Sequence, residues 1–148
     1  MKRFSSLLVV CVLALSMLCG CGSKFKKTDL ETVIGILEND GYYDESRLIY
    51  IKTDEVIKCN GLLTNGWKFA FFDFMKDKDA CDGEYEAEVT RAGTVSRFED
   101  GNYSLVEADD DVIYRLIIRV DNTYLVIMGG SDDKKDIREL ATEIGYYE

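Results

Sequence analysis

Cysteine is the most reactive side chain in this sequence, which holds five cysteines and no histidine. Three of the five lie within the first 22 residues, and Cys59 and Cys81 follow much later. Without histidine the chain lacks the commonest general base and the usual partner that turns a cysteine into a thiolate nucleophile. Cys59 and Cys81 also lack the short spacing of a zinc-binding pair. We therefore expect no catalytic thiol, no metal site and no cofactor.

The first 20 residues have the pattern of a cleaved export signal. Lys2 and Arg3 form a positively charged start, and Leu7–Met17 is an apolar run of eleven residues. This run has the length of a signal-peptide core, whereas a membrane-spanning helix needs about 20 residues. It is followed by Leu18-Cys19-Gly20-Cys21, in which a leucine stands three residues before Cys21. An ordinary secretory signal and an uncleaved membrane anchor are the alternative interpretations.

Leu18-Cys19-Gly20-Cys21 resembles the lipobox of bacterial lipoproteins. The resemblance implies that the Cys21 thiol receives a diacylglyceryl group and that a peptidase then cuts between Gly20 and Cys21. Acyl chains such as palmitate give stable anchoring when two are attached. We predict a signal peptide over residues 1–20, a lipidated tether over 21–27 and a single domain over 28–148, held on the extracellular face of the cell membrane.

The charge of the chain limits its partners. The formal net charge is -10, and cleavage would make it -12, because two of the 18 basic residues and none of the 28 acidic ones would be lost. Binding to a nucleic-acid backbone needs clustered lysine and arginine, so we expect no nucleic acid. With 47% hydrophobic residues, the chain has enough apolar material for a packed core.

Residue periodicity predicts an α+β domain with the order α-β-β-α-β-β-β-α. Its consecutive hairpins imply a mostly antiparallel sheet of about five strands, with the helices on one face.

We expect the first helix at 29–39, capped by Thr28 with Glu31 three residues later, and the last helix after Asp133. Cys81, Tyr85 and Val89 would form the inner stripe of the middle helix, capped by Asp77 or Asp79. The expected strands are 47–52, 67–75, 103–108, 112–120 and 123–128. Residues 55–63 are ambiguous and could form a short strand with a turn at Asn60-Gly61, and 92–102 is expected to be a loop.

The last hairpin allows a more specific inference. The two-residue loop Asp121-Asn122 favours a type I′ turn and fixes the register, so that Arg119 faces Tyr124. One face of the two strands is then the core, with Leu116, Ile118, Val120, Leu125 and Ile127. Arg115, Arg119 and Tyr124 lie on the other face, among apolar residues. We interpret that face as a solvated one; the alternative hypothesis is a partner-binding surface.

Two features have both a structural and a functional interpretation. An extracellular location permits a disulfide between Cys59 and Cys81, but both lie among apolar residues, which favours two buried thiols. Acidic runs such as Asp109–Asp111 lack the spacing of a calcium loop, so we interpret them as turns and helix caps, with weak calcium binding as the alternative.

Several segments together give a wider resemblance. These are the lipobox, WKFAFFDFMKDKDAC at 67–81, GNYSL at 101–105, RVDNTYLVI at 119–127 and IGYY at 144–147. In this combination the chain resembles small uncharacterised lipoproteins of clostridia-like Gram-positive bacteria, and the resemblance assigns a role to Cys21 alone. We expect a non-enzymatic binding or accessory module at the cell surface, with a protein or envelope component as partner. The alternatives are a small carboxylate-dependent envelope hydrolase or lyase, and an inhibitor or immunity-type protein for a basic target.

Overall fold

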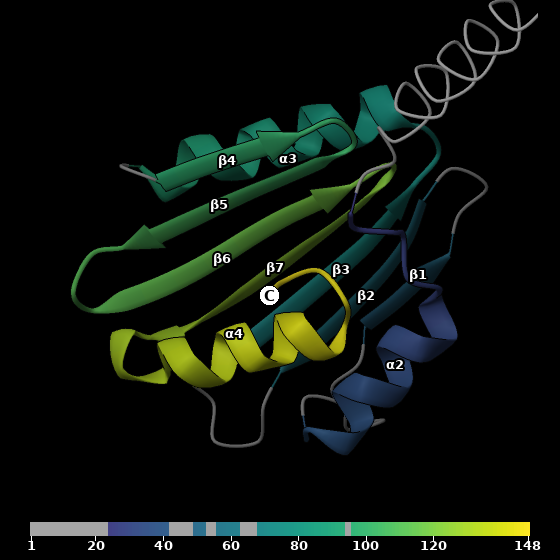
Figure 1. Cartoon of the computed structure of the whole chain (residues 1–148). Coiled ribbons are helices and arrows are strands. Elements are labelled where there is room, and N and C mark those ends of the chain that lie inside the picture. The colour runs from purple at the N-terminus through teal and green to yellow at the C-terminus, as the bar shows by residue number, and fades with distance from the viewer. Residues whose placement is uncertain (1–23, 42–48, 53–55, 63–67, 94–95) are drawn as a thin grey trace, which may run out of the picture.

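The computed structural model describes residues 24–41, 49–52, 56–62, 68–93 and 96–148, with the backbone alone for 49–52 and 56–62. An antiparallel sheet of seven strands, ordered β1-β2-β3-β7-β6-β5-β4, forms its centre (Figure 1). The strands are β1 (Ile49–Lys52), β2 (Val56–Leu62), β3 (Phe69–Met75), β4 (Ser96–Asp100), β5 (Tyr103–Asp109), β6 (Ile113–Val120) and β7 (Thr123–Gly130). The helices are α2 (Leu30–Asn39), α3 (Lys78–Ala92) and α4 (Lys134–Glu143), with a short 3₁₀ turn, η1, at Ser131–Asp133.

The α+β class, the antiparallel sheet and the order of the three helices confirm the sequence-based prediction. Two strands exceed the expected number. The ambiguous segment 55–63 contains β2, and the segment expected to be a loop contains β4. All five residues of β4 are exposed, so this edge strand has no alternation of buried and solvated positions from which it could be predicted.

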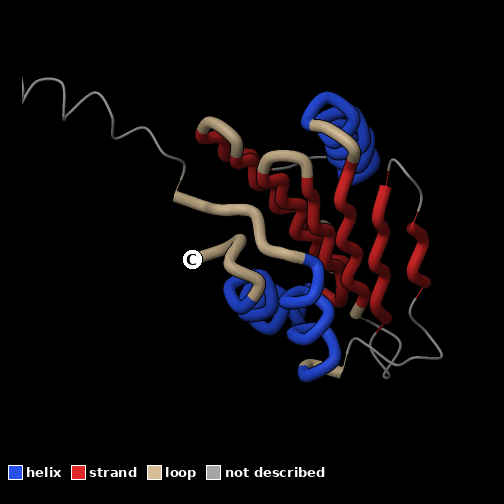
Figure 2. Tube along the Cα trace, turned by 90° about the vertical axis from the view of Figure 1, so that its right-hand side faces the viewer, coloured by secondary structure: helices blue, strands red, loops and turns tan. Residues whose placement is uncertain are grey.

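Helices cover both faces of the sheet, which corrects the expectation that all of them lie on one face. Figures 1 and 2 show α2 and α4 together on one side and α3 on the other. The reason lies in the central hairpin, whose strands are apolar on both faces. Ile118 and Leu125 pack with α2 and α4, whereas Ile117 and Val126 pack with α3. Each apolar face needs a cover that excludes water.

The helix ends show which caps form. Asp77 caps α3 by accepting the Ala80 amide at 2.9 Å, and the predicted inner stripe of α3 is buried. In α2, however, the cap is Asp29 rather than Thr28, since the Asp29 carboxylate accepts the Thr32 amide at 3.0 Å. The Thr28 hydroxyl instead donates to the carbonyl of Ile144, at 2.6 Å. A long-range contact thus replaces the local capping bond expected of Thr28.

The segment 24–28 lies against the domain. Its Phe25 ring stacks on Tyr103 with centroids 4.1 Å apart, and Lys27 Nζ donates to Asn122 Oδ1 at 3.0 Å. The Thr28 amide donates to the Tyr146 hydroxyl at 3.2 Å. The segment 24–27, expected to belong to the lipidated tether, therefore lies against the folded body through Phe25 and Lys27.

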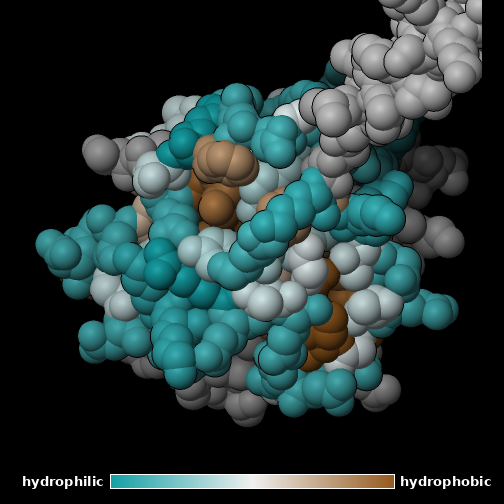
Figure 3. Space-filling view, viewed as in Figure 1, coloured by the Kyte–Doolittle hydropathy of each residue, from teal (hydrophilic) through white to brown (hydrophobic). Residues whose placement is uncertain are grey.

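An apolar surface lies beside this docked segment. Figure 3 shows hydrophobic colour over β4 and β5, and a second patch between α4 and α2, on a face that is otherwise largely hydrophilic. Phe98 is 55% exposed in the patch over β4 and β5, and its ring lies 6.2 Å from that of Tyr103. Phe25, Leu105 and Tyr147 line the same hollow. No helix among the described residues is both long and apolar enough to cross a bilayer.

Tyr146 joins the docked segment to the core. Its side chain is fully buried, and its hydroxyl lies 2.7 Å from Thr123 Oγ1 as well as accepting the Thr28 amide. Its backbone carbonyl accepts the Tyr103 hydroxyl at 2.9 Å. One tyrosine therefore links the N-terminal segment, β5, β7 and the end of α4.

We expect Tyr146→Phe to lower the free energy of unfolding by about 1–2 kcal/mol, because the Thr28 amide and the Thr123 hydroxyl lose a buried partner. The N-terminal segment should also loosen. Urea denaturation would measure the first effect, and the rate of tryptic cleavage after Lys26 and Lys27 in the native protein the second. Unchanged cleavage would contradict the role given to this hydroxyl.

Glu107 fastens α4 and the C-terminal residues to β5. Arg138 and the Tyr147 hydroxyl both donate to its carboxylate, and Arg138 Nε also donates to the Tyr114 hydroxyl at 3.1 Å. Burial raises the pKa of Glu107, but the hydrogen bonds from Arg138 and Tyr147 outweigh it and leave the pKa below the ordinary value of 4.5. The charged carboxylate therefore stabilises the fold.

This stabilisation is present above pH 4.5 and is lost as the pH falls through the depressed pKa of Glu107. We expect Glu107→Gln to be about 1 kcal/mol less stable at pH 7 and to lose less stability on acidification than the wild type. Urea midpoints measured from pH 7 to about pH 3 would show this. Glu139→Gln is the matched control, because Glu139 is exposed on α4 and pairs only with Lys135 within the described chain; its profile should follow the wild type.

Candidate functional site

The structure confirms the predicted register of the last hairpin. Arg119 pairs with Tyr124 and Arg115 with Met128. Of the two loop residues only Asp121 has a positive φ, 53°, so the loop is not the type I′ turn that was expected. The pairing of Val120 with Thr123 and the alternation of the two faces are nevertheless those of a two-residue hairpin.

The face that holds Arg115, Arg119 and Tyr124 is not an open sheet surface. It lies under α3, and Arg119 and Tyr124 are only 7% and 4% exposed. Arg115 is half-buried at the C-terminal end of α3, where its guanidinium donates to the Arg91 carbonyl at 3.4 Å. The interpretation as a solvated face is therefore corrected, because Ile117 and Val126 form an apolar strip that α3 covers. The partner-surface hypothesis can apply only to what α3 leaves uncovered.

Arg119 fixes α3 to the sheet. Its guanidinium lies 2.9 Å from Asp82 Oδ1 on α3 and donates to Ser104 Oγ on β5 at 2.7 Å. It also lies over the Tyr85 ring, 5.8 Å from the centroid. A buried cation with these partners is compensated for its loss of hydration. This arginine is thus a structural residue that orients α3.

Tyr124 marks the other border of the helix-covered area. It lies opposite the fully buried Asp73 of β3, and its ring contacts that of Phe71 with centroids 5.5 Å apart. Burial raises the pKa of Tyr124, and the nearby negative charge of Asp73 adds to this. The phenol therefore stays protonated and belongs to the wall of the adjacent depression.

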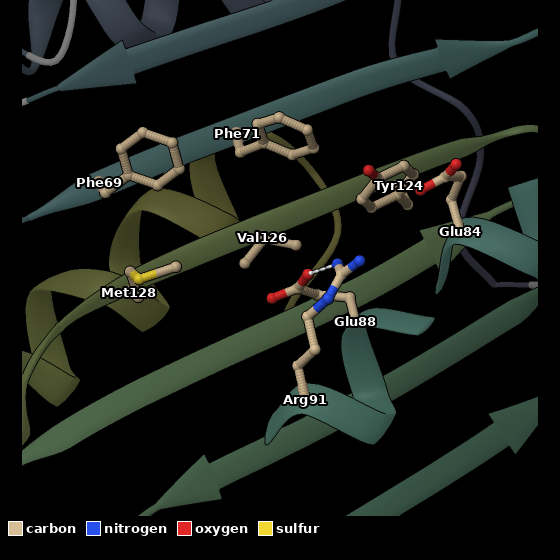
Figure 4. Close-up of a pocket in the computed structure, with 8 residues that line it drawn as sticks. All are labelled: Phe69, Phe71, Glu84, Glu88, Arg91, Tyr124, Val126 and Met128. Carbon is tan, nitrogen blue, oxygen red and sulfur yellow. Dashed lines mark hydrogen bonds and ion pairs between the residues drawn. The ribbon is translucent and has the colours of Figure 1, made fainter. Parts of the chain in front are cut away.

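A groove of about 340 Å³ opens where α3 stops covering the sheet. Figure 4 shows that the side chains of β3 and β7 form its floor and those of α3 its rim. The floor holds the rings of Phe69 and Phe71, whose centroids lie 6.3 Å apart. Tyr124, Val126 and Met128 complete it. The floor is therefore apolar and mostly aromatic.

The rim of the groove is charged. Glu84, Glu88 and Arg91 lie on α3 at spacings of four and three residues, and Arg91 Nη1 donates to Glu88 Oε2 at 2.7 Å. Within the described chain Glu84 forms no salt bridge. The helical spacing of these residues was visible in the sequence. What sequence reasoning missed is that β3 lies beside β7, which brings the phenylalanines under that rim.

The two cysteines that follow Cys21 can be placed in part. Cys81 is a free thiol on the buried side of α3, which faces the sheet, and burial raises its pKa to about 12. Cys59 lies opposite Phe72 in the backbone register of β2 and β3, and its side chain lies outside the described residues. For the two cysteines together, the expectation of two thiols, with a disulfide as the alternative, stays a prediction. Cys21 and the predicted cleavage point between Gly20 and Cys21 also lie outside the described residues.

The acidic run Asp109–Asp111 forms a turn. Asp110 Oδ1 accepts the amides of Val112 and Ile113, and Asp109 accepts the Ser131 hydroxyl at 2.7 Å. These hydrogen bonds lower the pKa values of Asp109 and Asp110. No group of three or more histidine, cysteine, aspartate or glutamate side chains among the described residues is arranged to hold a metal ion.

We expect Cys81 to resist alkylation in the native protein at pH 8, because its thiol is buried and stays protonated. In denaturant without reductant, mass spectrometry should show alkylation of both Cys59 and Cys81. Alkylation that appears only after reduction would establish the disulfide instead.

Comparison with known proteins shows a likeness in fold. No protein-family model matches the sequence, and no curated protein matches it. Among solved structures, the crystal structure of a GTP binding regulator from Thermotoga maritima superposes with a TM-score of 0.54 and 12% sequence identity. The match covers 81% of this chain and 90% of that chain. At this identity the likeness extends to the arrangement of strands and helices, and not to any functional residue.

Proposed function

We propose that the mature chain is a lipid-anchored binding or accessory module on the extracellular face of a cell membrane. The observation that carries the proposal is the leader, in which a positive start, an eleven-residue apolar core and Leu18-Cys19-Gly20-Cys21 agree. The resemblance of the chain to small bacterial lipoproteins supports the same assignment. Cys21 would carry the acyl chains and replace a membrane-spanning helix as the anchor.

The docked N-terminal segment makes such an anchor short. Lys24 follows Cys21 by three residues, so at most about 10 Å of extended chain would separate the lipid from a residue that lies on the domain. Phe25 and Lys27 contact Tyr103, the first residue of β5, and the turn residue Asn122, both at one end of the sheet. We infer that this end would lie next to the bilayer, leaving the opposite end, with Met128, directed outward.

The groove beside α3 is the feature that suits a binding role. Its volume of about 340 Å³ is at the small end of the usual range for ligand pockets, and its apolar floor with few polar groups is typical of them. We propose it as the surface that the anchored domain presents.

A carboxylate-dependent hydrolase or lyase fits the groove less well. Such chemistry needs two carboxyl groups that flank the bond to be broken. Glu84 and Glu88 instead lie on the same wall, one turn apart on α3, and Glu88 is engaged by Arg91. An inhibitor or immunity-type role shares the anchored arrangement, and a steep dependence of partner binding on salt would mark it.

The anchor can be tested with two cysteine variants of the full-length gene. We expect wild type and Cys19→Ser to incorporate labelled palmitate and to enter the detergent phase of a Triton X-114 extraction. Cys21→Ser should incorporate none and should keep residues 1–20, because acylation precedes cleavage in lipoproteins of this kind. Intact mass would show the retained leader.

Cys19→Ser is the matched control, since it changes a neighbouring thiol and leaves Cys21 intact. Palmitate incorporation in Cys21→Ser, or a native wild-type protein that keeps its leader, would overturn the lipid anchor.

A further inference from the structure

The groove beside α3 combines aromatic rings with carboxylates, and this combination points to a class of ligand. We propose that it binds a small organic ammonium ion. The inference rests on the proposed function in one respect, that the groove is the ligand site of the domain. It adds the charge and chemical class of the ligand.

Three aromatic rings form a continuous row along the floor. Phe69 and Phe71 are half-buried neighbours on one side of β3, and Tyr124 of β7 follows with its ring 5.5 Å from that of Phe71. Ring faces carry negative partial charge and attract a cation within about 6 Å of the centroid. Val126 and the thioether of Met128 offer apolar contact to the alkyl groups of the same ligand.

Two carboxylates overhang this row of rings. Figure 4 shows Glu84 beside Tyr124, and Glu88 reaching over the groove from α3. With Arg91 included, the lining has one net negative charge, and the whole chain has a formal charge of -10. The negative electrostatic potential of such a groove attracts cations and raises their local concentration. An anionic ligand would meet both carboxylates and is disfavoured.

Arg91 pairs with Glu88, the carboxylate that a ligand cation in the groove would also contact. The Arg91 side chain is 66% exposed, however, and ion pairs at such exposed positions hold weakly. A ligand that contacts Glu88 and the rings together can replace it. Arg91 would then act as a competitor for the site, so that its removal should strengthen binding.

The probe for this proposal is choline, with 3,3-dimethyl-1-butanol as its uncharged isostere. The two molecules have nearly the same shape and differ in the charge of the central atom. The mature lipidated protein, held in an uncharged maltoside detergent, would be titrated while the ring resonances of Phe69, Phe71 and Tyr124 are followed by NMR. We expect saturable shifts with choline and at least about tenfold weaker binding of the isostere.

Variants separate the contacts of the groove from the general charge of the protein. Arg91→Gln should tighten choline binding by about threefold, and Glu88→Gln should weaken it by about fivefold, as expected for partly exposed charges. Arg97→Gln and Glu139→Gln are the matched controls, because Arg97 pairs with Glu86 and Glu99, and Glu139 with Lys135, all away from the groove. Both controls should bind choline like the wild type.

Equal binding of choline and its isostere would overturn the proposal, and so would weaker choline binding in Arg91→Gln. Either result would leave palmitate labelling at Cys21 untouched, so the ligand class and the lipid anchor fail independently. Loss of folding is separated from loss of binding by the ring resonances of Tyr103 and Tyr114, which lie outside the groove and should keep their positions in every variant.

Discussion

The register of the hairpin formed by β6 and β7 is the constraint on which the rest of the structure depends. Its two-residue loop pairs Val120 with Thr123, and side chains then alternate between the faces with a period of two. Ile118 and Leu125 therefore point to α2 and α4, while Ile117 points to α3. A slip of one residue would exchange the two sets and leave both apolar layers without their covers.

The position of α3 follows from the same register and creates the groove. Arg119, on the face opposite Ile118, pairs with Asp82 and holds the helix against β6. A helix fixed there cannot also cover the outer part of β3, so Phe69 and Phe71 remain half-buried at its border. The groove is thus the part of β3 and β7 that α3 does not cover, and its charged rim consists of side chains of α3.

The other face combines the core with the N-terminal segment. Tyr146 contacts Thr28 and Thr123, while Phe25 stacks on Tyr103, so the chain leaves the domain from a defined place. A tether that ends on a packed residue restricts orientation far more than a free one of the same length, since few bonds remain free to rotate. Under the proposed lipid anchor, the domain would keep one end toward the bilayer.

The sequence by itself determined the features that depend on near neighbours. The helix stripe of Cys81, Tyr85 and Val89 and the β6–β7 register follow from spacings within a few residues. The sequence narrows the cap of α3 to Asp77 or Asp79, and the structure selects Asp77. The predicted leader around Cys21, on which the proposed anchor depends, rests on the sequence alone. Tertiary structure decided the order of the strands in the sheet. It placed β3 beside β7, although more than forty residues of chain separate them. Burial of Arg119, docking of residues 24–28 and the groove all depend on such distant pairings. Local periodicity cannot report them, because the free energy that selects them comes from contacts that form only when the whole sheet is assembled.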